Sequence, residues 1–304
     1  MFNNMRICIF GSSGLAGQGI AKALQDDSQC SSDLLLPRRI DVDLENYQDV
    51  VNYLLTTKPD IVIMAAGKVG GIDFNQRNQI LQYEYNQKLN ENLLLAASKV
   101  SIKRFILISS SCIYPVSSVK PIKEADLFNG LPEATNEGYA AAKSNAIRHL
   151  LLIRKYEDRN WSALIPTNIY GNVSHFLTDD HVLPMLIRKF QSGVNVINVW
   201  GDGTPIRQFL NNYDLGLAVR FSILNDGLPP ILNVSTDESV TIKELINKLV
   251  QNFKFNGEII FDVSKPNGNP DKRLDNSLMK GVGWKSTISL ESGLTSLVSY
   301  LNSR

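Results

Sequence analysis

Short apolar segments alternate with longer amphipathic segments through the first half of the chain. The apolar segments are RICIF from Arg6, DLLL from Asp33, DIVIMAA from Asp60, RFILISS from Arg104 and SALIP from Ser162. They are continuously apolar, as strands of a parallel sheet are when helices cover both faces. Between them the pattern predicts helices over 15–25, 44–56, about 76–99 and 139–156. This order predicts an α/β fold, a Rossmann-type doubly wound parallel sheet with right-handed crossovers.

The pattern loosens after residue 170, where the predicted elements are shorter. They are a helix from Val182, a strand NVINVW that ends at a GDGTP turn from Gly201, a strand PPILNVS, a helix from Thr241 and a strand EIIFDV. We interpret residues 1–170 as a Rossmann domain, to which a segment of about 205–238 returns, and residues 171–304 as a smaller α/β substrate-binding lobe.

Composition and charge narrow the classes of partner. The 304 residues include 31 basic and 30 acidic side chains, a net charge of +1, whereas nucleic-acid-binding proteins usually carry a basic stripe. The three cysteines, Cys8, Cys30 and Cys112, have no metal-ligand spacing and suit a reducing compartment. The N-terminus lacks the pattern of a signal peptide, and no apolar stretch approaches the roughly 20 residues that span a bilayer. We therefore expect a cytoplasmic protein with no nucleic-acid, membrane or metal partner.

A glycine-rich turn follows the first strand directly. Gly11, Gly14 and Gly17 give the spacing GxxGxxG, with Ser13 and Leu15 between them, and a predicted helix begins there. Glycines at this place let the backbone approach a pyrophosphate, and the N–H groups at the start of the helix face the phosphates. The spacing resembles that of extended short-chain dehydrogenases. The alternative interpretation is a tight turn that binds no ligand.

The end of the second strand bears on the choice of cofactor. NAD enzymes place an acidic residue there for the ribose 2′-hydroxyl, whereas NADP enzymes place an arginine for the 2′-phosphate. Here the strand runs into Pro37, Arg38 and Arg39, which favours NADP(H), because a guanidinium can bind a phosphate through two hydrogen bonds. Asp43 and Leu44 would then flank the adenine. The alternative is that the two arginines are solvated surface charges.

A tyrosine and a lysine stand four residues apart in a predicted helix, as Tyr139 and Lys143, and Ser110 follows the fourth strand. At that spacing the two side chains project from one face of the helix. The ammonium can lower the pKa of the phenol and hold a cofactor ribose, while the phenol protonates a ketone oxygen that Ser110 also hydrogen-bonds. The combination predicts an oxidoreductase, although a YxxxK pair alone is more often a solvated helix face.

Several longer segments carry a resemblance to one family. They are AAGKVGGI from Ala65, SSSCIYP from Ser109, EATNEGYAAAK from Glu133, PTNIYG from Pro166, HVLPMLIRKF from His181 and VWGDGTPIRQF from Val199. Together they resemble the GDP-L-fucose synthases, extended short-chain dehydrogenases that epimerise GDP-4-keto-6-deoxymannose at C3 and C5 and then reduce C4 with NADPH. The resemblance runs from about residue 6 to about residue 300.

The resemblance implies catalytic roles for five residues. Ser110, Tyr139 and Lys143 match the reductase triad, and Cys112 and His181 match the acid–base pair of epimerisation. A C4 ketone acidifies the protons on C3 and C5, so one site can invert both carbons, and a thiolate there needs a nearby cation or acid. The alternatives are that Cys112 is a small buried hydrophobic residue and that His181 is a packing or surface residue.

The resemblance also implies two sets of binding residues. For the cofactor it adds to the turn and the arginines the residues Ala65, Ala66, Asn86, Ser109, Lys143, Pro166, Asn168, Ile169 and His181. For the GDP-sugar it implies Asn168, Lys189, Trp200, Arg207, Asn267 and Lys272. Trp200 offers a flat face to guanine or sugar, and the cations meet the diphosphate. Without the resemblance, Trp200 would be assigned to the core.

Three departures from the family pattern fall in the substrate lobe. The loop after Gly171 differs, Asp179 and Asp180 precede His181, and Asn267 replaces the acid of the usual KPDG. They leave open an alternative, a C4 reductase of a related GDP-4-keto-6-deoxy sugar, such as a heptose, with little or no epimerase activity. A regulator that binds NADP without catalysis is disfavoured, because the whole reductase triad is retained. By the family's example we expect a homodimer.

Overall fold

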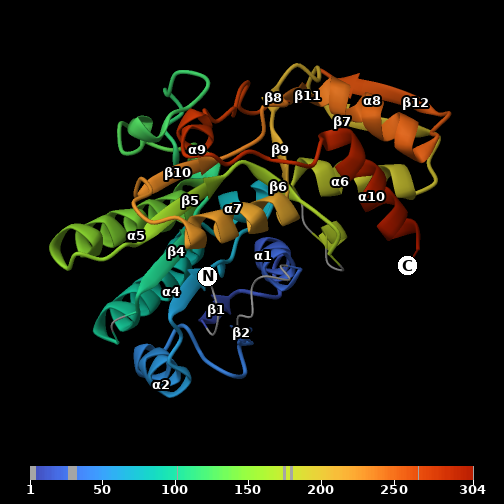
Figure 1. Cartoon of the computed structure of the whole chain (residues 1–304). Coiled ribbons are helices and arrows are strands. Elements are labelled where there is room, and N and C mark those ends of the chain that lie inside the picture. Colours follow the sequence, from blue (N-terminus) through green and yellow to red (C-terminus); the bar gives the residue numbers. More distant parts are fainter. Residues whose placement is uncertain are drawn as a thin grey trace.

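Six parallel strands form the central sheet, in the order β10-β5-β4-β3-β1-β2 (Figure 1). The computed structural model describes residues 5–26, 33–100, 102–173, 176–178, 181–265 and 267–303. The strand bounds are β1 Arg6–Phe10, β2 Asp33–Leu35, β3 Ile61–Met64, β4 Arg104–Ile108, β5 Ser162–Pro166 and β10 Ile231–Val234. The predicted doubly wound α/β sheet is confirmed.

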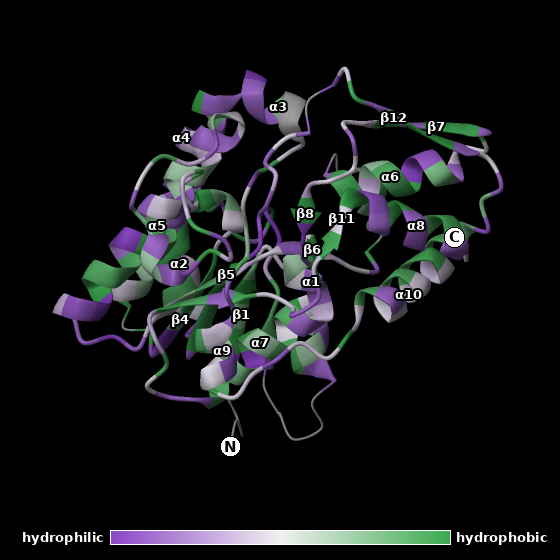
Figure 2. Ribbon diagram, turned by 90° about the horizontal axis from the view of Figure 1, so that it is seen from above, coloured by the Kyte–Doolittle hydropathy of each residue, from purple (hydrophilic) through white to green (hydrophobic). Residues whose placement is uncertain are grey.

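Helices cover both faces of this sheet. One face carries α2 (Tyr47–Thr57), α4 (Gln79–Lys99) and α5 (Glu137–Tyr156), and the other carries α1 (Leu15–Gln25), α7 (Asn212–Leu224) and α9 (Ser277–Gly281). Side chains alternate along each strand, so Cys8 and Phe10 enter the first core and Ile7 and Ile9 the second. Figure 2 shows these central strands as hydrophobic and the helices as mixed, which is the pattern that the sequence carries.

A third core lies beyond the sheet, at the upper right of Figure 1. Its helices are α6 (Val182–Gln191), α8 (Ile242–Phe253) and α10 (Leu290–Asn302). Its strands form three pairs, β6 (Asn168–Tyr170) with β9 (Phe209–Asn211), β7 (Val196–Trp200) with β12 (Glu258–Asp262), and β8 (Ile206–Arg207) with β11 (Val240–Thr241). Among the described residues, no helix combines the length and the apolar character needed to cross a bilayer.

Polar side chains shift two predicted helix boundaries. The helix predicted over about 76–99 is divided into α3 (Ile72–Arg77) and α4, because the Asn78 side chain bonds the Phe74 carbonyl at 2.8 Å and the backbone leaves the helical conformation there. The next difference is at α2, which begins at Tyr47 and not at residue 44. Asn46 caps it, its side chain accepting the N–H of Asp49 at 3.2 Å. Single 3₁₀ turns occur at η1 (Ser111–Ile113), η2 (Glu124–Asp126), η3 (Ala134–Asn136) and η4 (Phe176–Thr178).

The segment 271–275 ties the third core to the sheet side of the molecule. It forms one β-bridge from Asp271 to Ile206 of β8 and another from Leu274 to Ile122, in the long connection before α5. Between them, the buried Gln208 side chain accepts the Leu274 N–H at 2.8 Å and donates to the Leu274 carbonyl at 3.4 Å. Side chains that project from this segment therefore start from a fixed backbone.

Candidate active site

A groove opens at the carboxyl end of β1, where the chain order in the sheet reverses. β1 lies between β2 and β3, and ligands of such sheets bind at this switch point. Gly11 has a φ of +84°, and a Cβ there would lie 2.5 Å from the Ala66 backbone nitrogen. A Cβ on Gly17 would lie 2.1 Å from the Gly11 carbonyl oxygen. On Gly14 it would meet only that oxygen, at 3.3 Å, so Gly14 leaves space on the side of the groove.

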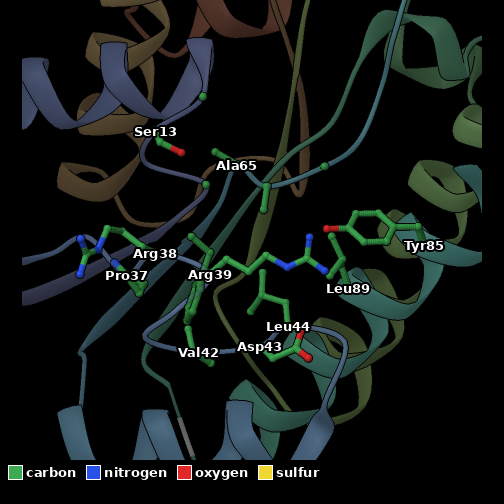
Figure 3. Close-up of a pocket in the computed structure, with 15 residues that line it drawn as sticks. Ser13, Pro37, Arg38, Arg39, Val42, Asp43, Leu44, Ala65, Tyr85 and Leu89 are labelled. Atoms are coloured by element: carbon green, nitrogen blue, oxygen red, sulfur yellow. The ribbon is translucent and has the colours of Figure 1, made fainter. Parts of the chain in front are cut away.

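Figure 3 shows the groove and its lining. Nine predicted cofactor residues line it, namely Gly11, Ser13, Gly14, Arg38, Arg39, Asp43, Leu44, Ala65 and Ala66. Leu15 and Gly17 belong to α1, just behind the turn. The sequence interpretation missed Phe10, Val42, Gly67, Tyr85 and Leu89. All but Leu89 adjoin a predicted cofactor residue in sequence, and only the fold brings Leu89 to the groove.

The two arginines after β2 lie at the groove with different orientations. In Figure 3 the Arg39 side chain extends across the groove toward Tyr85, whereas Arg38 points to the other side. Arg38 pairs with Asp41 at 3.2 Å and Arg39 with Glu45 at 3.1 Å, and the arginine side chains are 74% and 77% exposed. The backbone and side chain of Arg38 lower the pKa of Asp41. Both guanidiniums are therefore in water and able to exchange a carboxylate for a phosphate.

Asn86, predicted to bind the cofactor, holds the loop after β3. Its carboxamide accepts the Lys68 N–H at 2.8 Å and donates to the Lys68 carbonyl at 2.9 Å. The buried amides continue in a chain, since Gln82 donates to Asn75 at 2.6 Å and Asn75 donates to Asn136 at 2.6 Å, just before α5. This network fixes the loop beside the groove relative to the start of α5, a role that no sequence motif indicated.

Tyr139 and Lys143 lie one turn apart on α5 and are both buried, with exposed fractions of 7% and 2%. The Lys143 ammonium donates to the carbonyls of Ala66, at 3.3 Å, and Ile108, at 3.2 Å, and lies 5.9 Å from the Tyr139 ring centre. Those carbonyls follow β3 and end β4. A Cβ on Gly67, which lines the groove, would be 3.6 Å from the same ammonium. Lys143 thus joins the groove to the phenol.

The serines after β4 reach the same place. Ser110 caps the turn η1, and its hydroxyl accepts the Cys112 N–H at 3.5 Å. Ser109 is 5% exposed, and its hydroxyl has no hydrogen-bond partner within the described part of the chain. Because an unsatisfied buried hydroxyl is costly, this atom fits a site that a polar ligand completes.

Burial sets the proton affinities at this centre. It raises the pKa of Tyr139, and the nearby Cys112 adds to that rise. It lowers the pKa of Lys143 to about 8. It also raises the pKa of Cys112, against the hydrogen bond from Ser110 and the positive charges of Lys272 and Lys143. The expected lowering of the phenol pKa by Lys143 is therefore wrong here, because desolvation and the nearby Cys112 both raise that pKa, and the phenol keeps its proton.

Two of the predicted substrate cations gather around a carboxylate that the sequence interpretation did not single out. The Lys272 ammonium pairs with Glu133 at 2.5 Å, and both side chains are 24% exposed. Burial lowers the pKa of the Arg207 guanidinium, while the charges of Glu133 and Asp271 oppose that change. Glu133 opens the segment EATNEGYAAAK, so the motif contained it, but only the fold pairs it with residues far along the chain.

Trp200 and Asn267 lie together at the end of β7. The Trp200 side chain is exposed (65% for the residue), with the Lys265 ammonium 5.9 Å from its ring centre, so the alternative of a core tryptophan is wrong. Asn267 accepts the backbone N–H of Asp202 at 2.8 Å. It therefore fixes the turn that follows Trp200.

The other predicted residues lie at the end of β5, on β6 and on α6. Asn168 donates to the Gln208 carbonyl at 2.9 Å, and Ile169 packs against the second core. Pro166 ends β5. His181 is exposed at the N-cap of α6, and Lys189, later in α6, donates to the Asn198 carbonyl at 2.6 Å. Cys30, His175, Asp179 and Asp180 lie outside the described residues.

Comparisons with known proteins agree with this architecture. The NAD dependent epimerase/dehydratase family matches residues 7–235. GDP-L-fucose synthase 1 of Arabidopsis thaliana is 34% identical over 297 residues, 95% of this chain and 91% of the relative. GDP-L-fucose synthase of Escherichia coli (strain K12) is 32% identical over 309 residues, 97% and 95% of the two chains. A GDP-L-fucose synthetase from Naegleria fowleri, solved bound to NADP, shares the fold with a TM-score of 0.89 and 24% identity, covering 98% of this chain and 93% of that one.

Proposed function

This chain belongs to the NAD dependent epimerase/dehydratase family, and within it to the GDP-L-fucose synthases, and from that premise we propose that it makes GDP-L-fucose. The substrate is GDP-4-keto-6-deoxymannose, which the enzyme epimerises at C3 and C5 and reduces at C4 with NADPH. One observation carries the proposal. Tyr139, Lys143 and the serine–cysteine turn after β4 lie at the same edge of the sheet as the glycine turn.

The residues around the groove fit NADP(H). Gly14 leaves room for a phosphate beside the start of α1, and Arg38 and Arg39 offer two solvated guanidiniums to a 2′-phosphate. Ala65 and Leu44 line the walls on which an adenosine would rest. Bound there, NADPH supplies the hydride that reduces C4.

The reductive step uses a phenol that remains protonated. Burial raises the pKa of Tyr139, so its hydroxyl carries a proton that it can donate to the C4 oxygen as hydride arrives, and Ser110 hydrogen-bonds the same oxygen. The Lys143 ammonium, anchored on two backbone carbonyls, holds the ribose of the cofactor and favours the phenolate that remains. A proton from solvent then restores the phenol.

Epimerisation uses the same ketone before reduction. The C4 carbonyl acidifies the C–H bonds at C3 and C5, so Cys112 as a thiolate removes a proton and the electron pair moves onto the C4 oxygen. His181 returns a proton to the opposite face of each carbon. Each inversion therefore exchanges one carbon-bound hydrogen, which leaves a trace in heavy water.

The decisive experiment incubates the purified protein with NADPH and GDP-4-keto-6-deoxymannose in heavy water and identifies the product by NMR. We expect GDP-L-fucose with deuterium at C3 and C5. Reduction with no deuterium at either carbon would instead support the alternative, a C4 reductase of a related GDP-4-keto sugar. The departures from the family pattern at Asp179, Asp180 and Asn267 favour testing that second reaction.

Cys112→Ser separates the two half-reactions. We expect it to suppress deuterium exchange at C3 and C5 far more than it slows reduction of a ketone that is already epimerised, because a serine hydroxyl is a much weaker base than a thiolate. Equal exchange in the variant and the parent would remove Cys112 from the mechanism.

We also propose a cytoplasmic homodimer that pairs through α4 and α5. Both helices expose large hydrophobic side chains, with Ile80 75%, Leu152 51% and Tyr156 73% exposed. Cys8 and Cys112 are free thiols, as a reducing compartment maintains. Sedimentation equilibrium of the parent and of Leu152→Glu measures the association, and a monomeric parent would contradict it.

A further inference from the structure

Tyr114 ends the turn that carries Cys112. That turn, η1, spans Ser111–Ile113, and the Tyr114 N–H closes it by donating to the Ser111 carbonyl at 3.4 Å. The Tyr114 side chain is buried in the first core, and its hydroxyl donates to Asn233 Oδ1 at 2.6 Å. One side-chain hydrogen bond therefore ties the end of the turn to a residue 119 positions away in the sequence.

Asn233 is a rigid anchor for this bond. It lies on β10, the edge strand of the central sheet, and is fully buried. Its amide nitrogen donates to the carbonyls of Ile122 and Asp275, both at 3.0 Å, and its backbone N–H donates to Glu124 at 2.7 Å. The amide therefore cannot turn away from Tyr114 without giving up two other buried hydrogen bonds.

The beginning of the turn is held separately. The Ser109 N–H donates to the Leu164 carbonyl of β5 at 2.8 Å, and Ser110 is the next residue. Cys112 lies two residues beyond Ser110 and two before Tyr114, and its own N–H makes only a long bond, 3.5 Å, to the Ser110 hydroxyl. Loss of the phenol bond should therefore displace the Cys112 thiol more than the Ser110 hydroxyl.

We propose that Tyr114, through its hydrogen bond to Asn233, is a positioning residue that holds the Cys112 thiol where it reaches C3 and C5 of the sugar. Tyr114 acts only through the turn and neither gives nor takes a proton. The chemical step stays the same, in that Sγ as a thiolate takes the proton from carbon and the electron pair of that C–H bond moves to the C4 oxygen. The inference rests on the proposed epimerase step.

Tyr114→Phe tests the position of the thiol in catalysis, because it removes the hydroxyl and keeps the ring in the core. In heavy water with NADPH and GDP-4-keto-6-deoxymannose, we expect deuterium exchange at C3 and C5 to slow by about tenfold or more, since a small misplacement of a reacting group is costly. Reduction of a ketone that is already epimerised should stay within about twofold of the parent, because Ser110 is held from the sheet.

Alkylation tests the position of the turn without substrate. The full-length protein receives a short pulse of iodoacetamide at about pH 8, and mass spectrometry follows Cys112 and Cys8, which trypsin places on different peptides. Cys8 is fully buried in β1, so its alkylation reports opening of the whole domain. In Tyr114→Phe we expect alkylation of Cys112 to quicken about fivefold and that of Cys8 to stay unchanged, because only the turn is loosened.

Tyr170→Phe is the matched control. Tyr170 is another buried tyrosine, on β6 in the third core. This variant should keep the parental ratio of exchange to reduction and the parental alkylation of both cysteines.

The inference is overturned if Tyr114→Phe keeps the parental rate of exchange or the parental alkylation of Cys112. It is also overturned if Cys8 alkylation rises as much as that of Cys112, or if Tyr170→Phe gives the same changes. Melting temperature and NADPH binding confirm that each variant is folded. Asn233→Leu, which removes the acceptor of the same bond, replaces Tyr114→Phe if that variant is unfolded.

The two proposals fail separately. If the parent shows no deuterium at C3 and C5, the epimerase function is wrong whatever the alkylation result. If the parent incorporates deuterium and Tyr114→Phe does so equally fast, only the role of Tyr114 is wrong.

Discussion

The nucleotide groove and the reaction centre adjoin at Gly67 but are built on different principles. The groove is shaped by backbone, with Gly11 and Gly17 packed against other main-chain atoms, and its charged side chains, Arg38 and Arg39, are mostly in water. The reaction centre is made of side chains removed from water, and Lys143 is 2% exposed. Charges in water cost little to keep and are screened by salt, whereas buried charges are costly and interact strongly.

This difference indicates which region determines the affinity for the cofactor and which determines the rate of proton transfer. Shape and solvated charge in the groove govern how tightly the cofactor binds. Desolvated groups in the centre govern proton transfer, because their proton affinities are shifted by burial. Substitutions in one region should therefore change a quantity that substitutions in the other leave alone.

The largest effect is expected from Tyr139→Phe. Loss of the hydroxyl removes the proton donor to C4, so the rate of reduction should fall by about 10²- to 10⁴-fold. NADPH affinity, measured by fluorescence titration, should stay within about twofold because Tyr139 is not part of the groove lining. If the variant kept the turnover of the parent, Tyr139 would not be the proton donor. If it lost NADPH binding, the groove and the reaction centre would not be separate in function.

A pair of glycine variants gives the next largest effect. Gly14→Ala places a methyl group where only the Gly11 carbonyl lies within 4 Å, so it should weaken NADPH binding by at least about tenfold without lowering the melting temperature. Gly17→Ala places its Cβ against that carbonyl at 2.1 Å and should lower both quantities. NADPH titration measures the affinity of each variant, and thermal melting measures its stability. Equal losses of stability in the two variants would contradict the role given to Gly14.

Arg39→Ala should have a smaller and more selective effect. Removing the guanidinium that spans the groove should weaken NADPH binding about tenfold and leave NADH binding nearly unchanged, because only NADPH carries the 2′-phosphate. The NADPH affinity of the parent should also fall as salt rises. Arg38→Ala serves as the comparison, since Figure 3 shows the Arg38 side chain pointing to the opposite side from Arg39. An equal loss for both cofactors would mean that Arg39 does not recognise the phosphate.

Lys143→Met should show the smallest effect, in the pH dependence of stability. The pKa of Lys143 is lowered from 10.5 to about 8, so between these values the unfolded chain holds a proton that the folded chain has released. Raising the pH across this window therefore favours the folded parent, by about 2 °C per pH unit in melting temperature relative to the variant. Below pH 8 the difference should be constant. If the melting temperatures of the parent and the variant changed with pH in parallel, Lys143 would not be desolvated in the folded protein.

The strands and helices could be predicted because their buried faces require apolar residues at regular positions in the sequence. The apolar segments RICIF and SALIP, which are buried on both faces, were correctly predicted as strands. The glycine turn marked the place in the sheet where the strand order reverses. The break at Asn78 was missed, because a side chain that bonds its own helix backbone leaves no trace in an apolar pattern. The rise of the Tyr139 pKa, where a fall was expected, was missed for a related reason, since desolvation depends on the whole fold.

The parts of the site whose residues are neighbours in the sequence could be predicted. The contacts between residues that are far apart in the sequence could not. Ser110, Tyr139 and Lys143 lie in recognisable motifs. The pairing of Glu133 with Lys272 spans 139 residues, and no local pattern reports it. Asn86 was assigned to the cofactor from the family resemblance, and in the structure its carboxamide bonds the backbone of Lys68.

The tie formed by segment 271–275 limits how the molecule can move. If the third core moved away from the sheet, either the β-bridge at Asp271 or the β-bridge at Leu274 would break. The buried Gln208 amide would also lose its hydrogen bonds to the Leu274 backbone. Such losses oppose a hinge between the two halves. We therefore expect a sugar nucleotide to enter and leave by local displacement of side chains and surface turns.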